Sequence, residues 1–256
     1  MFIPGVSVLA LFATMAGGLH GAASPDPAGE LRLELNLPSF TVHVFEGDSL
    51  ISSYETTIGR PPFITPPGEY EISEIEWNPW WYPPASSWAA GREVTPPGPG
   101  NPMGRSKIRF SGPLLLHGTT ESELIGAVGS HGCVRLSNEE ILELSRIVVT
   151  RGEPGFDRST LPAIEADDRD TKRLYLSNPI PFSVTYELFT HLGGGHFRLY
   201  PDVYNRGYDR VIPRARHMLG EMMPGVSVDE DPLLLGIEDA RTSGEPIDFF
   251  LRDLIG

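Results

Sequence analysis

The stretch 114–137 gathers the side chains best suited to covalent catalysis. It holds the only cysteine of the sequence, Cys133, together with His117, His131 and Arg135. A thiol with a nearby imidazole is typical of a nucleophilic acyl-transfer site, because the imidazole takes the thiol proton. A guanidinium two residues beyond the thiol is able to bind a carboxylate with paired hydrogen bonds. These residue types predict acyl transfer on a substrate that carries a free carboxylate.

Two other interpretations of the stretch stay open at this point. A single cysteine is often a small buried apolar residue with no chemical role. A zinc site made by Cys133, His117, His131 and a fourth ligand is the second alternative, although no CxxC or HxxxH spacing supports it. Because the spacing does not support zinc, we expect no metal and no cofactor.

The elements around the stretch are expected to place these groups. The apolar segment 114–116 predicts a strand that leads directly into His117. The glycine at Gly132 allows a tight turn, so that the N–H groups of Gly132 and Cys133 face a developing oxyanion. Ser137, followed by a glutamate three residues later, predicts a capping box and a helix over 138–149.

Most of the remaining chain indicates β structure. The alternation of leucines with polar residues over 31–37 predicts a half-buried strand. Similar patterns predict strands over 40–44, 50–58, 70–77, 107–110, 174–190 and 196–200. The segment 151–170 is polar and is expected to be irregular. The predicted fold is mainly β, a curved β-sandwich of mixed sheets with one main helix.

An aromatic, proline-rich segment interrupts the strands. Residues 61–102 contain eleven of the 25 prolines, and all four tryptophans fall within 77–88. Such a run predicts an ordered surface loop, since proline disrupts helices and central strands. We expect Trp80, Trp81 and Tyr82 to form a substrate-binding wall or lid. The alternative is a small apolar cluster that only covers one end of a sheet.

The N-terminus and the net charge restrict location and partners. Residues 1–23 combine a short apolar run with small residues and predict a signal peptide, and 24–30 reads as a linker. We therefore expect export to the periplasm or cell envelope. A net charge of −14 argues against a nucleic-acid partner, because phosphate binding needs basic surface.

Several motifs together resemble one known family. The runs HGT at 117–119 and SHGCVRL at 130–136 are similar to the active-site signature of the L,D-transpeptidase catalytic domain (YkuD type) of bacterial cell-wall enzymes. TPPG at 65–68 and PPGPGNPMG at 96–104 resemble two further elements of that family. We expect a catalytic domain over 31–205. Residues 206–256 are expected to form a C-terminal extension of unknown role.

The resemblance implies a cysteine-dependent acyltransferase of peptidoglycan and cell-wall biogenesis. In that family's reaction Cys133 would attack a tetrapeptide stem and release D-Ala, with His117 as base and the Gly118 carbonyl orienting the imidazole. An amine of a second stem, or a lipoprotein lysine, would then take the acyl group. Arg135 would bind a stem carboxylate, and carbapenems would acylate the thiol. The supporting residues implied are His131, Ser130 and Gly132.

Two further functions share these residues. If water takes the acyl group, the protein is an L,D-carboxypeptidase or hydrolase that uses the same acyl-enzyme. A non-catalytic cell-wall-binding protein is the other alternative. No oligomeric state is predicted.

Overall fold

A computed structural model describes residues 29–256. The expected signal peptide (1–23) and most of the expected linker (24–30) lie outside the described residues. No helix within the described part combines the length and the apolar character that a membrane crossing requires.

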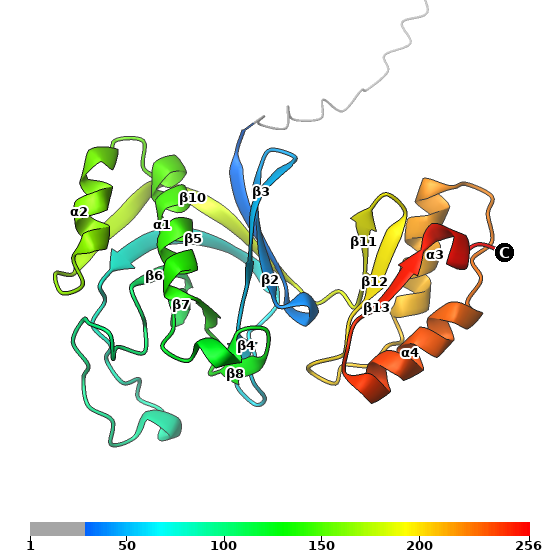
Figure 1. Ribbon diagram of the computed structural model, residues 1–256, viewed down its shortest axis with the longest axis horizontal. Helices are drawn as coiled ribbons and strands as arrows, with labels where there is room; N and C mark the ends of the chain where they lie inside the picture. Colours follow the sequence, from blue (N-terminus) through cyan, green and yellow to red (C-terminus); the bar gives the residue numbers. More distant parts are fainter. Residues whose placement is uncertain (1–28) are drawn as a thin grey trace, which may run out of the picture.

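One curved mixed sheet forms the larger part of the molecule (Figure 1). Its eight strands run in the order β3-β2-β1-β10-β5-β6-β7-β9. Their bounds are β1 Leu31–Asn36, β2 Thr41–Glu46, β3 Ser49–Glu55, β5 Gly68–Trp77, β6 Ser106–Ser111, β7 Leu114–Gly118, β9 Val134–Leu136 and β10 Lys172–Thr185. The β1/β10 and β7/β9 pairs are parallel and the other pairs are antiparallel. The mainly β prediction is confirmed.

Local sequence explains why these strands form. In β1 the leucines at alternate positions are buried and the intervening polar residues are half-exposed, as a strand with one covered face requires. A turn at Gly47, where φ is +56°, closes the β2–β3 hairpin. A register shift between Tyr175 and Ile180 interrupts the pairing of β10 with β5 and adds curvature to the sheet.

Helix α1, Asn138–Gly152, is the main helix, and it begins where the sequence predicts. The Ser137 Oγ accepts the Glu140 N–H at 3.2 Å, and the Glu140 carboxylate accepts the Ser137 N–H at 3.1 Å. The helix buries Ile141, Leu144 and Val148 in the main hydrophobic core, against one face of the sheet.

The segment expected to be irregular contains a second helix. Helix α2, Leu161–Ala166, has a proline in its first turn, a position that proline tolerates well. At six residues it is too short for apolar periodicity to be recognised in the sequence. Short connections complete this part: the strands β4 Ile58–Gly59 and β8 Val128–Ser130 pair in parallel, and the 3-10 helices are η1 Leu37–Ser39, η2 Ser87–Ala89, η3 Ser122–Leu124 and η4 Arg158–Thr160. A fifth 3-10 helix, η5 Leu251–Asp253, follows the last strand near the C-terminus.

The C-terminal residues build a separate small unit beside the large sheet (Figure 1). Its sheet has the order β11-β12-β13, and its elements are β11 Phe189–Gly193, β12 His196–Leu199, α3 Val211–Met222, α4 Asp231–Ser243 and β13 Ile247–Phe250. Its hydrophobic core is distinct from that of the large sheet and runs from Leu188 to Leu254. This core begins upstream of the expected boundary at 205, because β12 pairs with β13 instead of with the large sheet.

Candidate active site

The register of three neighbouring strands places His117 between Arg135 and Lys107. His117 of β7 is opposite Arg135 of β9 and opposite Lys107 of β6. Residues paired across a sheet project from the same face. The adjacent pair, Leu116 and Val134, is buried in the main core, so the His117 row projects from the opposite face.

His117 is almost fully buried, and one hydrogen bond fixes its ring. The Nδ1 atom lies 2.6 Å from the Gly118 carbonyl oxygen. A carbonyl only accepts, so Nδ1 carries the proton and Nε2 keeps its lone pair. Burial lowers the pKa of His117 to about 4, and the nearby charges of Arg135 and Lys107 lower it as well. The imidazole is therefore neutral near pH 7, in the tautomer that a general base needs.

Close packing holds the Gly118 backbone in place. A Cβ on Gly118 would lie 2.4 Å from the Asn138 side-chain oxygen, so only glycine fits. The Asn138 amide donates to the Thr119 carbonyl at 3.1 Å, and its oxygen accepts the Arg105 N–H at 2.9 Å. The first residue of α1 thus anchors the strand end that presents His117.

Cys133 lies just before β9, on a partly buried turn. Its Sγ is 3.7 Å from the Pro113 carbonyl oxygen. Burial raises the pKa of the thiol, while Arg135 and Arg109 oppose that effect. Within residues 29–256 no hydrogen bond joins the thiol to His117; Cys133 directly precedes β9, the strand that pairs with the His117 strand.

The turn over residues 130–133, which ends at Cys133, is tightly bonded. The Ser130 hydroxyl donates to the Cys133 carbonyl and accepts the Gly132 N–H at 3.1 Å. Gly132 has φ of +106°, a conformation that favours glycine. Because Ser130 takes the Gly132 N–H, the expected pair of oxyanion donors is reduced to the Cys133 N–H. That N–H donates to no acceptor in the part of the chain that the structure describes.

Arg135 presents a guanidinium on the same face of the sheet. Its Nη1 is 2.5 Å from the Glu121 carboxylate, and its Nε is buried without a partner among the described residues. Its backbone is held by two 2.9 Å hydrogen bonds with Thr57. The guanidinium is thus fixed in position and retains donor capacity for another carboxylate. Sequence reasoning did not identify Glu121, which is a distant partner within an irregular segment.

His131 packs against the aromatic loop. The Trp88 ring stacks on it at 4.0 Å with an interplanar angle of 11°, and the Phe63 ring lies 5.2 Å away. The Arg60 guanidinium is 3.3 Å from Nε2, which must therefore be an acceptor. Burial lowers the pKa of His131, and the charge of Arg60 acts in the same direction. His131 is therefore neutral, and its ring packs the turn that ends at Cys133 against the aromatic loop.

The three residues expected to form an aromatic wall differ in exposure. Trp80 and Tyr82 are exposed and stack on each other at 6.5 Å. Trp81 is buried, and its backbone pairs with Thr95. The tryptophan that touches a candidate site residue is Trp88. The tryptophan content alone gave no means of choosing among these rings.

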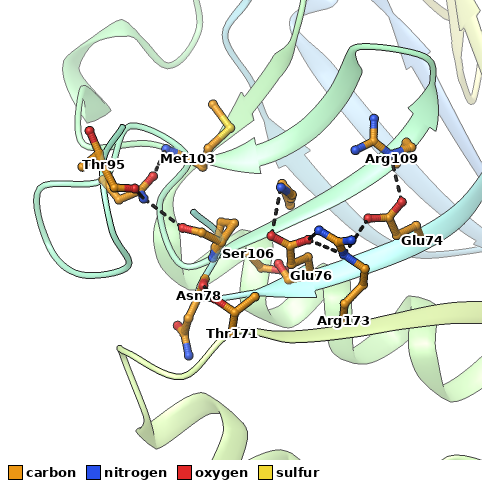
Figure 2. A network of polar contacts seen from close by, with 12 residues as sticks. Glu74, Glu76, Asn78, Thr95, Met103, Ser106, Arg109, Thr171 and Arg173 are labelled. Carbon is orange, nitrogen blue, oxygen red and sulfur yellow. Dashed lines mark hydrogen bonds and ion pairs between the residues drawn. The ribbon is translucent and has the colours of Figure 1, made fainter. Parts of the chain in front are cut away.

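A buried asparagine organises this loop. The Asn101 amide nitrogen donates to three carbonyls, those of Pro79 at 2.8 Å, Pro96 at 3.0 Å and Thr95 at 3.1 Å. Its oxygen accepts the Met103 N–H at 2.8 Å. Figure 2 shows these contacts near Thr95 and Met103. These hydrogen bonds connect parts of the loop that form little regular secondary structure.

A strip of alternating charge continues the His117 row across the sheet (Figure 2). Lys107 is 2.9 Å from the buried Glu76, which also accepts the Arg173 Nε at 2.6 Å. In the next row Arg109 bonds Glu74 at 2.9 Å. Charges at every second residue within β5 and β6 indicate such a strip, but the sequence does not show which strands pair.

The alternative of a zinc site finds little support in the geometry. Within residues 29–256 no group of three or more His, Cys, Asp or Glu side chains is arranged to hold a metal ion. The His117 Nδ1 is occupied by a carbonyl, and the His131 Nε2 faces a guanidinium.

Comparison with known proteins gives a consistent result. A family model described as the L,D-transpeptidase catalytic domain matches residues 30–157, half of the chain. A curated protein named as the L,D-transpeptidase YkuD of Bacillus licheniformis is 28% identical over 131 residues, which cover 51% of this chain and 67% of that protein. A protein of Fuscovulum blasticum, named as an L,D-transpeptidase, is 34% identical over 97 residues, covering 37% of this chain and 51% of that protein.

Solved structures of the same family are more distant. The catalytic domain of the E. faecium L,D-transpeptidase has 13% identity and a TM-score of 0.40, and the match covers 61% of this chain and 97% of that one. An L,D-transpeptidase solved in complex with imipenem has 16% identity and a TM-score of 0.39, with 61% of this chain and 59% of that chain covered. The chain spans about half to two thirds of the two curated relatives described above.

Proposed function

The chain belongs to the L,D-transpeptidase catalytic domain family, and on that premise we propose that it forms an acyl-enzyme at Cys133 with a peptidoglycan stem peptide. The thiolate attacks the carbonyl that precedes the terminal D-Ala, a thioester forms and D-Ala leaves. An amine of a second stem, or of a lipoprotein lysine, then attacks the thioester and regenerates the thiol. The reaction belongs in the cell envelope, where its polymer substrate is found.

The observation that carries this proposal is the tautomer of His117. Its Nδ1 proton is committed to the Gly118 carbonyl, which leaves Nε2 as a free base on the strand adjacent to Cys133. Since burial raises the pKa of the thiol, a base is needed to form the thiolate at neutral pH.

Two further groups suit the same reaction. The Cys133 N–H is a candidate donor to the oxyanion that develops on the attacked carbonyl. Arg135, on the same face of the sheet, is a candidate partner for a stem carboxylate, which would compete with Glu121 for the guanidinium. Substrate binding would then exchange an internal ion pair for an equivalent external one.

The aromatic loop supports transfer to an amine over hydrolysis. Trp88 covers His131 at the edge of the nucleophile turn, and such a cover limits the access of water to a thioester. A carboxypeptidase would use the same acyl-enzyme with water as acceptor. A wall-binding protein without activity would form no acyl-enzyme at all.

Incubation with a disaccharide-tetrapeptide, followed by mass spectrometry of the products, tests the proposal. A cross-linked dimer with released D-Ala is the expected product, and Cys133→Ala should form none. The exposed-serine variant Ser122→Ala is the matched control and should retain full activity. Tripeptide without dimer would overturn the transferase proposal in favour of hydrolysis. No product from the parent chain would favour the binding protein.

Acylation by a carbapenem tests the nucleophile independently of the acceptor. One relative in this family has been solved in complex with imipenem, and we expect the same drug to add its mass to this chain at Cys133. Cys133→Ala should remain unmodified. Absence of an adduct on the parent protein would remove Cys133 as the nucleophile.

A further inference from the structure

The hydroxyl of Tyr204 joins the C-terminal part of the chain to the loop that precedes β5. It donates to the Gly59 carbonyl at 2.8 Å and accepts the Thr65 N–H at 3.2 Å. One phenol thus holds both ends of the loop 59–65. The acyl-transfer chemistry described above assigns no role to this residue.

The loop 59–65 is also hydrogen-bonded to the turn over residues 130–133, the nucleophile turn, which ends at Cys133. The Thr65 hydroxyl is buried, accepts the Gly59 N–H at 2.8 Å and donates to the Gly132 carbonyl at 3.1 Å. The Arg60 N–H donates to the Ser130 carbonyl at 3.0 Å. Two carbonyls of the turn, those of Ser130 and Gly132, are therefore held from the same loop.

The bond to the Gly132 carbonyl bears directly on the reacting centre. The Gly132 carbonyl and the Cys133 N–H belong to one planar peptide unit and point in opposite directions. Fixing the carbonyl therefore fixes the direction of the Cys133 N–H, which donates to no acceptor among the described residues. A small rotation of this unit would misdirect the N–H from an oxyanion.

Tyr204 is itself well supported. Its ring stacks on Tyr186 at 5.5 Å, and its N–H donates to the Tyr186 hydroxyl at 2.8 Å. That hydroxyl donates to the Asp202 carboxylate at 2.5 Å, and the Arg206 guanidinium lies 4.5 Å from the Tyr186 ring. Burial raises the pKa of Tyr204, so its phenol keeps the proton that it donates to Gly59.

We propose that Tyr204 is a positioning residue for acyl transfer, acting through Thr65 and the Gly132 carbonyl to direct the Cys133 N–H at the oxyanion. This inference rests on the proposed role of Cys133 as nucleophile. It gives the segment that leads into the C-terminal unit a role in the active site. The site is then incomplete without residues beyond the family-matched region 30–157.

Two reagents that react with the single cysteine separate this role from general stability. With p-nitrophenyl acetate, the Cys133 thiolate attacks the carbonyl carbon, the electron pair moves to oxygen, and collapse expels p-nitrophenolate and leaves a thioester. The thiol proton passes to His117 or to buffer. With iodoacetamide, sulfur displaces iodide at a saturated carbon and no oxyanion forms.

Tyr204→Phe removes the hydroxyl and keeps the ring. We expect its acylation rate to fall about tenfold, less than the roughly hundredfold or larger loss that removal of an oxyanion donor causes, because the Cys133 N–H is kept and only its direction changes. Its alkylation rate should stay within about twofold of the parent, because the thiol and its base are untouched. Thr65→Val should give the same selective loss, and Thr65→Ser, which keeps the hydroxyl, should restore acylation.

Tyr208→Phe is the matched control. The Tyr208 hydroxyl accepts the Asp202 N–H at 3.0 Å, in the same segment, and among the described residues it forms no hydrogen bond with the loop 59–65. Both of its rates should equal those of the parent. Unchanged acylation in Tyr204→Phe would overturn the inference. Equal changes in acylation and alkylation would also overturn it, because they would indicate general loosening.

The proposed function can fail separately from this inference. A parent protein that leaves stem peptides unprocessed, but shows the selective loss in Tyr204→Phe, would refute the substrate and retain the positioning role. A parent that processes stem peptides, while Tyr204→Phe keeps the parent rates of acylation and alkylation, would support the proposed function and refute the positioning role.

Discussion

Replacing His117 with asparagine should make the protein less sensitive to acid. The asparagine amide keeps a donor for the Gly118 carbonyl, but the titrating imidazole is gone. In the unfolded chain the histidine pKa is 6.5, and burial lowers it to about 4 in the folded protein. Between these two pH values the unfolded state binds more protons, so acid favours unfolding of the parent.

The size of the effect follows from the difference between these two pKa values. A pKa lowered from 6.5 to about 4, at about 1.4 kcal/mol per pH unit, gives about 3 kcal/mol of free energy of unfolding lost by pH 4. The loss begins near pH 6.5 and is absent above it. Other acidic groups titrate in both proteins and cancel in the comparison. His117→Asn should therefore lose about 3 kcal/mol less than the parent between pH 7 and pH 4.

Urea unfolding at a series of pH values measures this difference. The absolute stability of His117→Asn at pH 7 does not enter, because only the change with pH is compared. Cys133→Ala keeps the imidazole and should follow the parent curve. Parallel curves for the parent and His117→Asn would show that the imidazole is not held neutral, and would refute its assignment as a base with a free Nε2.

Three further substitutions test the scaffold of the site. Ser137→Ala removes one half of the capping box and should lower the free energy of unfolding by about 1 kcal/mol in urea titration. Glu76→Ala removes the carboxylate that pairs with the largely buried Lys107, and it should lower the free energy of unfolding by about 3 kcal/mol in the same titration. Trp88→Ala removes the stack on His131, worth about 1 kcal/mol, and should speed limited proteolysis of the aromatic loop about fivefold.

Each of these substitutions has a control in the same neighbourhood. Ser122→Ala changes an exposed serine outside the cap, and Glu71→Ala changes an exposed carboxylate on β5; both should stay within about 0.5 kcal/mol of the parent. Trp80→Ala alters an exposed ring of the same loop that does not touch His131, and cleavage should stay near the parent rate. A control that matched its test variant would remove the corresponding contact from the scaffold.

Features with local causes could be predicted from the sequence. The alternating leucines of β1 and the capping box of α1 each involve only a few neighbouring residues, so both patterns can be recognised in the sequence. The apolar residues 114–116 predicted the strand that leads into His117, but the alignment of His117 with Arg135 was not predicted. The structure adds the register that places them in one row.

Features that depend on partners distant in the sequence could not be predicted from it. The pairing of β13 with β12 joins segments about fifty residues apart, and nothing local in either segment specifies it. The contact between Trp88 and His131 depends on how a proline-rich loop folds back. The number of aromatic residues in the loop does not determine that path. The partner of Arg135, Glu121, lies in an irregular segment with no periodic signal.

Trapping the acyl-enzyme tests the central claim most directly. The parent protein would be mixed with a tetrapeptide stem, quenched in acid within seconds, digested and measured by mass spectrometry. The account predicts a tripeptidyl adduct on the peptide that contains Cys133, with D-Ala in solution and no adduct on Cys133→Ala. Release of D-Ala without an adduct at this thiol, or an adduct that persists in Cys133→Ala, would contradict it.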